Sequence, residues 1–279
     1  MMATDNATVE CALCEGSGYR LGTSGEWAVA SRCSCRTPCP DCSDSGFLVV
    51  EGEKGQAARP CDCRLLDRKI RLYNEAGIPA RFANCCIEDI GDRSKYDLLK
   101  HRAACEPGDP GFLLWGEPGV GKTHLVCGLV GYLTLERAFS CRFIDTMRLI
   151  RDLKHGLSEG KWDSEVIAPL LDVDVLVIDE LGKGRCSDFE LAVLDQLISS
   201  RYNAGRTIHC TSNYRPEAEG APSPGPGIEG GFPVLNTLRE RVGERIYSRL
   251  SEMCHIREVK GEDYRKTAQA KLSRKRRQP

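Results

Sequence analysis

Short apolar runs alternate with amphipathic segments from residue 112 onward. Apolar runs bounded by turn signals predict buried strands, which lie at 112–115, 142–145, 173–180 and 207–213. Segments with apolar residues at helical spacing predict helices, which lie at 124–137, 146–156 and 234–253. The length of 279 residues suits one medium α/β domain with a small accessory module.

The segment before this region has a different pattern. Residues 64–77 carry apolar positions among charges and predict a helix, which Gly77 and Pro79 end. Further toward the amino terminus, only residues 47–50 (FLVV) are typical of a strand. The helix is therefore the natural boundary between an amino-terminal module and the α/β domain.

Cysteines form an internal repeat in the amino-terminal module. Each copy reads C-x2-C, eighteen residues, then C-x-C, and the second copy lies 28 positions after the first. Four thiolates per copy suit a tetrahedral zinc ion. The sequence therefore predicts two zinc ions, and we favour ligands drawn from within one repeat, although a crossed pairing uses the same atoms. The predicted ligands are Cys11, Cys14, Cys33, Cys35, Cys39, Cys42, Cys61 and Cys63.

The strand at 112–115 runs into GEPGVGKT, which precedes a predicted helix. This strand–loop–helix context is the one in which the G-x-x-x-x-G-K-[ST] motif cradles nucleotide phosphates. Lys122 is expected to contact the β- and γ-phosphates of ATP, and Thr123 to place its hydroxyl on Mg²⁺. The predicted nucleotide-binding residues are Gly116, Glu117, Pro118, Gly119, Val120, Gly121, Lys122, Thr123 and His124.

Two acids end the strand at 173–180. Asp179 is suited to hold the Mg²⁺ shell, and Glu180 to accept a proton from the attacking water. Asn213 ends the next strand and could orient that water. Arg245 and Arg249 lie four residues apart on a predicted helix, where either could stabilise transition-state charge in a neighbouring subunit.

GEPGVGKTH, VDVLVIDELG, CTSNY and GERIYSRL, in this order, resemble the AAA+ ATPases of the DnaC/DnaI helicase-loader and IstB transposition-helper group. The resemblance runs from about residue 77 to 266. It implies a P-loop NTPase core with a five-stranded parallel sheet between helices, and hydrolysis across a subunit interface of a homo-oligomer. It also implies catalytic roles for Lys122, Asp179, Glu180 and Asn213, with Arg249 as the trans-acting finger and Arg245 as the fallback.

The expected organisation follows from these motifs. A Cys-rich module covers 1–64, a helical linker 65–80, the AAA+ domain 81–266 and a basic tail 267–279. Residues 215–233 are rich in Pro, Gly and Glu and are expected to be disordered. Few residues follow the core, so Arg265 is only a weak candidate for a second arginine sensor.

A basic row on the predicted helix at 146–156 is the candidate DNA contact. Arg148, Arg151 and Lys154 step by three along one face, which can neutralise a phosphate backbone without reading sequence. A solvated amphipathic face explains the same pattern. The overall charge gives little further evidence for DNA binding, because the net charge is −1 and basic residues gather in the tail.

Two functions in DNA metabolism compete, beside a third hypothesis of a nucleotide switch whose hydrolysis is incidental and whose zinc repeats do the recognition. The first is a Mg²⁺-dependent ATPase that loads a replicative DNA helicase onto single-stranded DNA. The alternative is an IstB-like helper that assembles on duplex DNA and recruits a transposase. No signal peptide or membrane span is expected, and clustered free cysteines fit a cytoplasmic protein.

Overall fold

A computed structural model describes residues 11–52, 55–89, 94–159, 166–217, 227–229, 232–234 and 236–264. The basic tail, Arg265 and most of the Pro- and Gly-rich segment lie outside these residues. The chain forms two compact units, Met1–Asn84 with Val130–Ser140, and Cys85–Leu129 with Cys141–Pro279. Within the described ranges, no helix has both the length and the apolar character needed to cross a membrane.

Two antiparallel hairpins form the Cys-rich region of the first unit. Strands β1 (Tyr19–Ser24) and β2 (Trp27–Arg32) make the first hairpin, and β3 (Phe47–Gly52) and β4 (Gly55–Pro60) the second. Their registers match with the 28-residue shift, since Leu21 pairs with Ala30 and Val49 with Ala58. The sequence analysis found only β3, because the other three strands lack a continuous apolar run.

Helix α1 (Arg64–Glu75) packs against β2 in the same unit. Ala28 and Ala30 are almost fully buried there, and Asn74 exchanges two hydrogen bonds with the backbone of Ala30. The short helix η1 (Ala80–Phe82) follows. The segment expected as a linker is therefore packed together with the first hairpin.

A five-stranded parallel sheet organises the second unit. Its strand order is β11-β5-β8-β7-β6, and every neighbouring pair is parallel. This confirms the predicted core. The strands are β5 (Gly111–Trp115), β6 (Cys141–Asp145), β7 (Val175–Asp179), β8 (Thr207–Ser212) and β11 (Cys254–Glu258). Strand β11 lies at the sheet edge and carries polar residues, so its pattern gave no strand signal.

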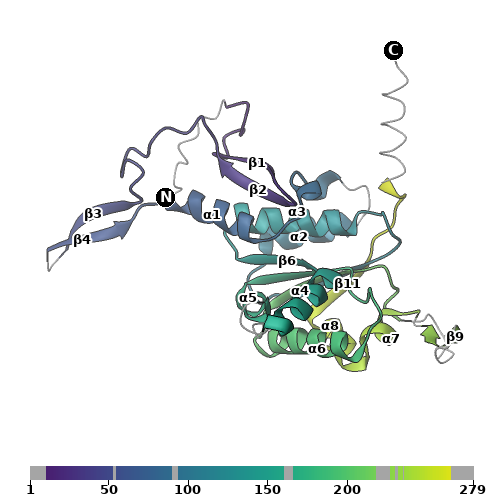
Figure 1. Cartoon of the computed structure of the whole chain (residues 1–279). Coiled ribbons are helices and arrows are strands. Elements are labelled where there is room, and N and C mark those ends of the chain that lie inside the picture. The colour runs from purple at the N-terminus through teal and green to yellow at the C-terminus, as the bar shows by residue number, and fades with distance from the viewer. Residues whose placement is uncertain are drawn as a thin grey trace, which may run out of the picture. The chain divides into compact units, whose positions relative to one another are not determined.

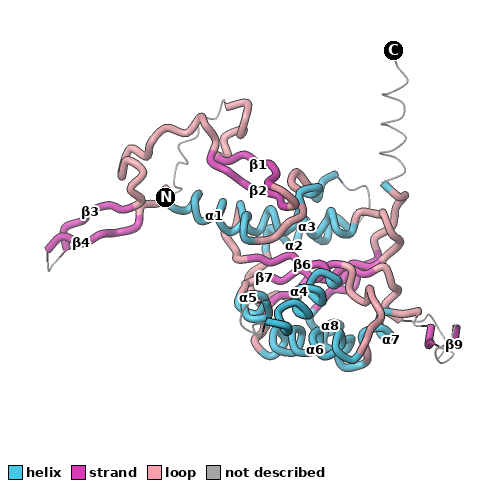
Figure 2. Tube along the Cα trace, in the orientation of Figure 1, coloured by secondary structure: helices cyan, strands magenta, loops and turns pink. Residues whose placement is uncertain are grey.

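Helices cover both faces of this sheet (Figures 1 and 2). Helices α4, α6 and α8 lie on one side and share a core with β7 and β8, and α2 lies on the other side. The helices of this unit are η2 (Ile87–Asp89), α2 (Ser94–Ala104), α4 (Thr146–Glu159), α5 (Ala168–Asp172), α6 (Asp188–Asn203), α7 (Leu238–Val242) and α8 (Glu244–Met253). Helix α3 (Lys122–Leu135) begins in this unit and ends in the first. Two short strands, β9 (Gly227–Glu229) and β10 (Phe232–Val234), pair with each other in antiparallel orientation.

The helix predicted at 234–253 is divided at Gly243. This glycine has φ 81° and separates α7 from α8, and a capping box of Thr237 and Glu240 starts α7. Helix α6, with its own capping box at Ser187 and Glu190, was not assigned from the sequence. Its apolar and polar residues do not separate into clear faces, which removes the periodic signal.

Arg201 on α6 is fully buried and hydrogen-bonds to the end of α5 and the start of β8. Its guanidinium donates to backbone carbonyls at the end of α5 and to Thr207 O at the start of β8, at 2.8 Å for the last. Burial lowers the pKa of this guanidinium to about 10. The contacts fix where β7 and β8 begin, and thereby where their carboxyl ends meet the nucleotide loop.

Candidate nucleotide site and cysteine clusters

The loop between β5 and α3 requires glycine at two positions. Gly116 and Gly119 have φ values of 148° and 88°. A Cβ at Gly116 would lie 2.4 Å from the Val259 carbonyl oxygen, and one at Gly119 would lie 2.0 Å from Asp263 Oδ1. These close approaches show that the segment after β11 lies directly on the loop.

Lys122 begins α3 and folds back over the loop. Its ammonium donates to the carbonyl oxygens of Gly116 and Glu117 at 2.7 and 2.8 Å, and the residue is only 6% exposed. The positive charge is therefore held at the loop, where helix N-terminal N–H groups favour a phosphate.

A carboxylate and two hydroxyls meet at the end of β7. Thr123 Oγ1 donates to Asp179 Oδ1 at 3.0 Å, and Thr211 Oγ1 donates to the same oxygen at 2.5 Å. Burial raises the pKa of Asp179 to about 6, against the two hydroxyl bonds that lower it. Hard oxygen donors of this kind are the ligands that Mg²⁺ prefers, so the set fits the predicted ion.

Glu180 follows directly, on a left-handed backbone with φ 56°. Its N–H donates to Thr211 Oγ1 at 3.0 Å, and its carboxylate accepts a hydrogen bond from the Lys183 ammonium. Sequence reasoning missed Thr211 and Lys183, although Lys183 stands only three residues after the expected catalytic acid. Asn213, which was expected to orient the water, is exposed two residues beyond Thr211. The side chain of this segment that hydrogen-bonds Asp179 is Thr211.

Arg249 and Arg245 both lie against Asp195 of α6. The guanidinium of Arg249 is 3.9 Å from Asp195 Oδ1 and lies over the Tyr202 ring, and its side chain is 23% exposed. Arg245 comes within 3.3 Å of the same oxygen but is 68% exposed. The fallback residue is thus the more accessible of the two.

A third arginine, Arg241, was not singled out from the sequence. Its guanidinium lies 4.2 Å from the centre of the Tyr214 ring and donates to the carbonyl oxygens of Gly182 and Gly184. It therefore joins α7 to the loop that follows Glu180.

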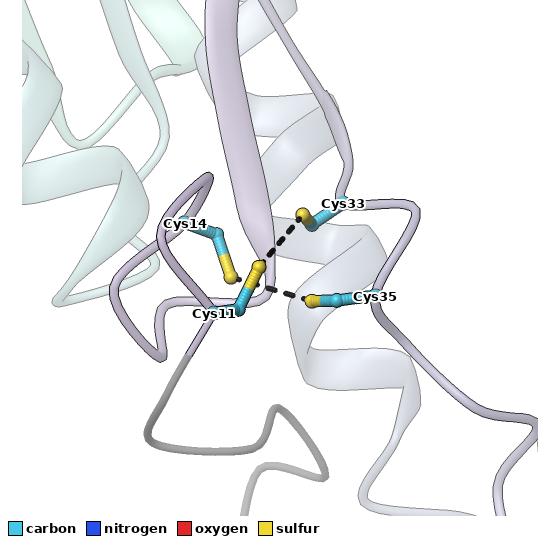
Figure 3. A group of neighbouring side chains, drawn as sticks. All are labelled: Cys11, Cys14, Cys33 and Cys35. Atoms are coloured by element: carbon cyan, nitrogen blue, oxygen red, sulfur yellow. Dashed lines mark hydrogen bonds between the residues drawn. The ribbon is translucent and has the colours of Figure 1, made fainter.

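The eight repeat cysteines gather into two groups, one per repeat. The sulfur atoms of each group all lie within 4.8 Å of one another, and the groups are Cys11, Cys14, Cys33, Cys35 and Cys39, Cys42, Cys61, Cys63. Figure 3 shows the first group converging from two turns. Sulfur separations repeat as well: Cys14 to Cys35 is 3.5 Å and Cys42 to Cys63 is 3.4 Å.

This arrangement is the pairing within repeats that we favoured. The Leu13 backbone N–H, together with the Cys35 thiol, lowers the pKa of Cys11 to about 7. Four sulfurs that converge within 4.8 Å of one another fit a tetrahedral zinc ion.

The basic row on α4 is partly neutralised within its own helix. Asp152 lies 3.6 Å from Arg148 and 3.4 Å from Arg151. The ammonium of Lys154 lies 5.9 Å from the centre of the Phe189 ring. Arg151, at 70% exposure, is more open to a phosphate than Arg148, at 31%, and Lys154 is exposed as well.

Comparison with known proteins identifies the core. Residues 109–218 match the IstB_IS21 family, described as IstB-like ATP binding protein. The replicative helicase loader DnaC of Escherichia coli K12 is 28% identical over 150 residues, which cover 51% of this chain and 61% of that protein. The crystal structure of the DnaC helicase loader covers 64% of this chain and 99% of its own, with 27% identity and a TM-score of 0.53. The core of this chain is thus similar to the IstB-like ATP-binding family and to the DnaC helicase loader.

Two further proteins are similar to this chain. The crystal structure of DnaI is 21% identical with a TM-score of 0.50 and supports the fold. The uncharacterized protein YqaM of Bacillus subtilis is 22% identical over 231 residues, which cover 72% of each chain. The Cys-rich repeats precede the 109–218 family match, so this family match does not extend to the repeats.

Proposed function

We propose that the AAA+ core hydrolyses ATP at the junction of the β5–α3 loop with the end of β7. The observation that carries this is the direct bond of Thr123 to Asp179, which joins the phosphate loop to the acidic strand end. The donor set would hold Mg²⁺, which shields phosphate charge during transfer. Lys122 then binds the β- and γ-phosphates, and Glu180 accepts the proton of the attacking water.

The ion pair between Glu180 and Lys183 sets a condition on this chemistry. The Lys183 ammonium occupies a carboxylate oxygen of Glu180, so this ion pair must open before that oxygen can accept a proton from water. Asn213 orients the water in this proposal. Arg249, or the more exposed Arg245, supplies positive charge to the nucleotide of a neighbouring copy in a homo-oligomer.

The biological role we propose is loading of a replicative DNA helicase onto single-stranded DNA. It is supported by the similarity to the E. coli protein named replicative helicase loader DnaC and to its crystal structure. The cysteine repeats bind two zinc ions and contact the helicase, and α4 contributes Arg148, Arg151 and Lys154 to the DNA path.

A transposition helper remains the second candidate, because the family that matches residues 109–218 is described as IstB-like. In that role the protein assembles on duplex DNA and recruits a transposase. The two functions differ in whether the protein binds single-stranded or double-stranded DNA.

The test is binding of the full zinc-loaded chain to matched single- and double-stranded oligonucleotides, with and without ATP, while phosphate release is recorded. We expect ATP to strengthen binding to single strands. A preference for duplex would transfer the proposal to the transposition helper, and the Lys122→Ala variant controls for ATP dependence.

A further inference from the structure

The second cysteine hairpin, β3–β4, lacks the helix that covers the first. Helix α1 packs against β2 (Figure 1), whereas at β3–β4 its first residue, Arg64, lies over the Phe47 ring at 4.5 Å. Phe47 and Val49 are 47% and 72% exposed, and every residue of β4 is exposed. We propose that this face binds an amphipathic helix of another protein in the way that the first hairpin binds α1.

The internal repeat supplies the template for this proposal. Both hairpins have the same strand register, and both begin at matched bonds, from Cys33 N to Gly18 O at 2.8 Å and from Cys61 N to Gly46 O at 2.9 Å. The strand that α1 covers in the first copy holds the buried Ala28 and Ala30, which correspond to Gln56 and Ala58. Small alanines allow a helix to approach a strand closely, and Ala30 is 4% exposed whereas Ala58 is open.

The edge of the hairpin offers the second half of the contact. In the first copy, Ala30 N–H donates to Asn74 Oδ1 at 2.6 Å, and Ala28 N–H donates to Ile78 O at 2.8 Å. The helix and the extended residues after it thus satisfy the outer edge of β2. The matching N–H groups of Gln56 and Ala58 lie on the outer edge of β4, which pairs only with β3 among the described strands.

Charge argues against a second copy of this chain as the occupant. Asp67 of α1 binds Arg32 on the first hairpin, and the position of Arg32 is Pro60 in the second. Gln56 replaces the buried Ala28, so α1 of another copy would meet a larger side chain and lose its ion pair. The same face instead carries Glu51, which favours a basic residue on the partner helix.

The proposal deepens the partner-binding role of the cysteine repeats and rests on the proposed function only for the partner's identity. A helix on one face and a strand edge beside it make a compact recognition mode with few side chains. Ala58 is its central contact, because its counterpart Ala30 is buried under α1, and Val49 lies directly opposite Ala58 on the same face.

The first arm of the test measures binding of the zinc-loaded full chain to the purified replicative helicase of the same organism. Ala58→Asp and Val49→Asp place a charge on the proposed face, and Ala57→Asp places one on the opposite face of the same exposed strand. We expect the first two to weaken binding by about tenfold or more and Ala57→Asp to change it by less than about threefold. Zinc content and ATP turnover should stay at the wild-type level in all three.

The second arm decides the proposal without reference to the helicase. A photo-crosslinking residue at position 49, with position 57 as the control, is used in extracts of the host, and the joined peptides are identified. A crosslink from position 49 to a helix of another protein, whose purified form shows the same dependence on Ala58, supports the proposal.

The outcomes separate the two proposals. Helicase binding that Ala58→Asp leaves unchanged would overturn the hairpin surface and keep the loader. Absence of helicase binding would overturn the proposed loader function. The crosslinks then decide whether the β3–β4 face binds a helix of another protein. A crosslink only to a second copy of this chain, or none specific to position 49, would overturn the hairpin proposal.

Discussion

Asp179 is held in an environment that disfavours its own charge. Burial raises the pKa of its carboxyl to about 6 although Thr123 and Thr211 donate to it. The folded state therefore carries a cost at neutral pH that a bound cation would remove. Such a carboxylate is suited to bind Mg²⁺ with ATP, and its buried charge destabilises the folded state without them.

Replacing Asp179 with Asn should stabilise the protein at pH 7.5 without nucleotide and Mg²⁺. Because the folded pKa is raised, the cost is absent below about pH 4, grows between pH 4 and 6, and is constant above. The stabilisation should be about 1–3 kcal/mol at pH 7.5 and vanish near pH 4. Chemical denaturation of the zinc-loaded protein across this pH range measures it, and a destabilised variant at pH 7.5 would contradict the assigned environment.

Glu180 gives a second prediction at the residue scale. Glu180→Gln keeps the shape and removes the base, so ATP turnover should fall about 10²–10⁴-fold while ATP affinity changes little. Glu244→Gln, an exposed acid on α8 that pairs with Arg239, is the matched control and should leave turnover intact. Steady-state phosphate release and nucleotide titration measure both, and unchanged turnover would remove Glu180 from the mechanism.

At the scale of elements, each cysteine hairpin depends on its own four sulfurs. The ligands come from the turns before the first strand and after the second, so a metal closes the open end of the hairpin and replaces a hydrophobic core that these strands lack. The second hairpin has the fewest other contacts, because every residue of β4 is exposed.

Cys42→Ser should lower the zinc content from two ions to one. The β3–β4 amides should lose protection from hydrogen exchange, whereas β1–β2, which is packed on α1, should keep it. Cys86→Ser, outside both groups, is the control. Loss of both ions from the Cys42 variant would show that ligands are shared between repeats.

Helix α4 carries the prediction for DNA. Reversing Arg148, Arg151 and Lys154 to Glu should weaken DNA binding and flatten its salt dependence, while ATP affinity stays the same. Arg148 and Arg151 both pair with Asp152, so each of the three residues is also reversed singly to find its share of the loss. Fluorescence anisotropy at several salt concentrations tests this, and unchanged DNA affinity would remove α4 from the DNA path.

At the scale of the whole molecule, the predicted nucleotide site and the predicted zinc sites lie in different compact units. The β5–α3 loop belongs to the unit Cys85–Leu129 with Cys141–Pro279, and all eight repeat cysteines belong to the other. The α3 helix is the element that both units share.

Lys122→Ala should therefore abolish ATP binding without releasing zinc. Isothermal titration with ATP and metal analysis of the purified variant check the two properties separately. Simultaneous loss of ATP binding and zinc would show that the units fold as one.

The sequence by itself determined the core and the chemistry of its candidate site. The loop residues Gly116 to Thr123 and the acids Asp179 and Glu180 stand in local motifs, where a few neighbouring residues fix both geometry and chemistry. The alternation of buried strands with helices determined the α/β fold, which the parallel sheet and the solved relatives confirm. Spacing alone also indicated two sets of four cysteines.

Only the tertiary structure decided contacts between residues far apart in the chain. Thr211 reaches Asp179 because β8 and β7 are neighbours, and Asp263 lies on Gly119 because β11 ends beside the loop. Strands β1, β2 and β4 gave no signal, since the metal-binding turns and pairing define them rather than an apolar run. Burial of one hairpin under α1 and exposure of its repeat also depended on packing, which identical spacing in the sequence does not encode.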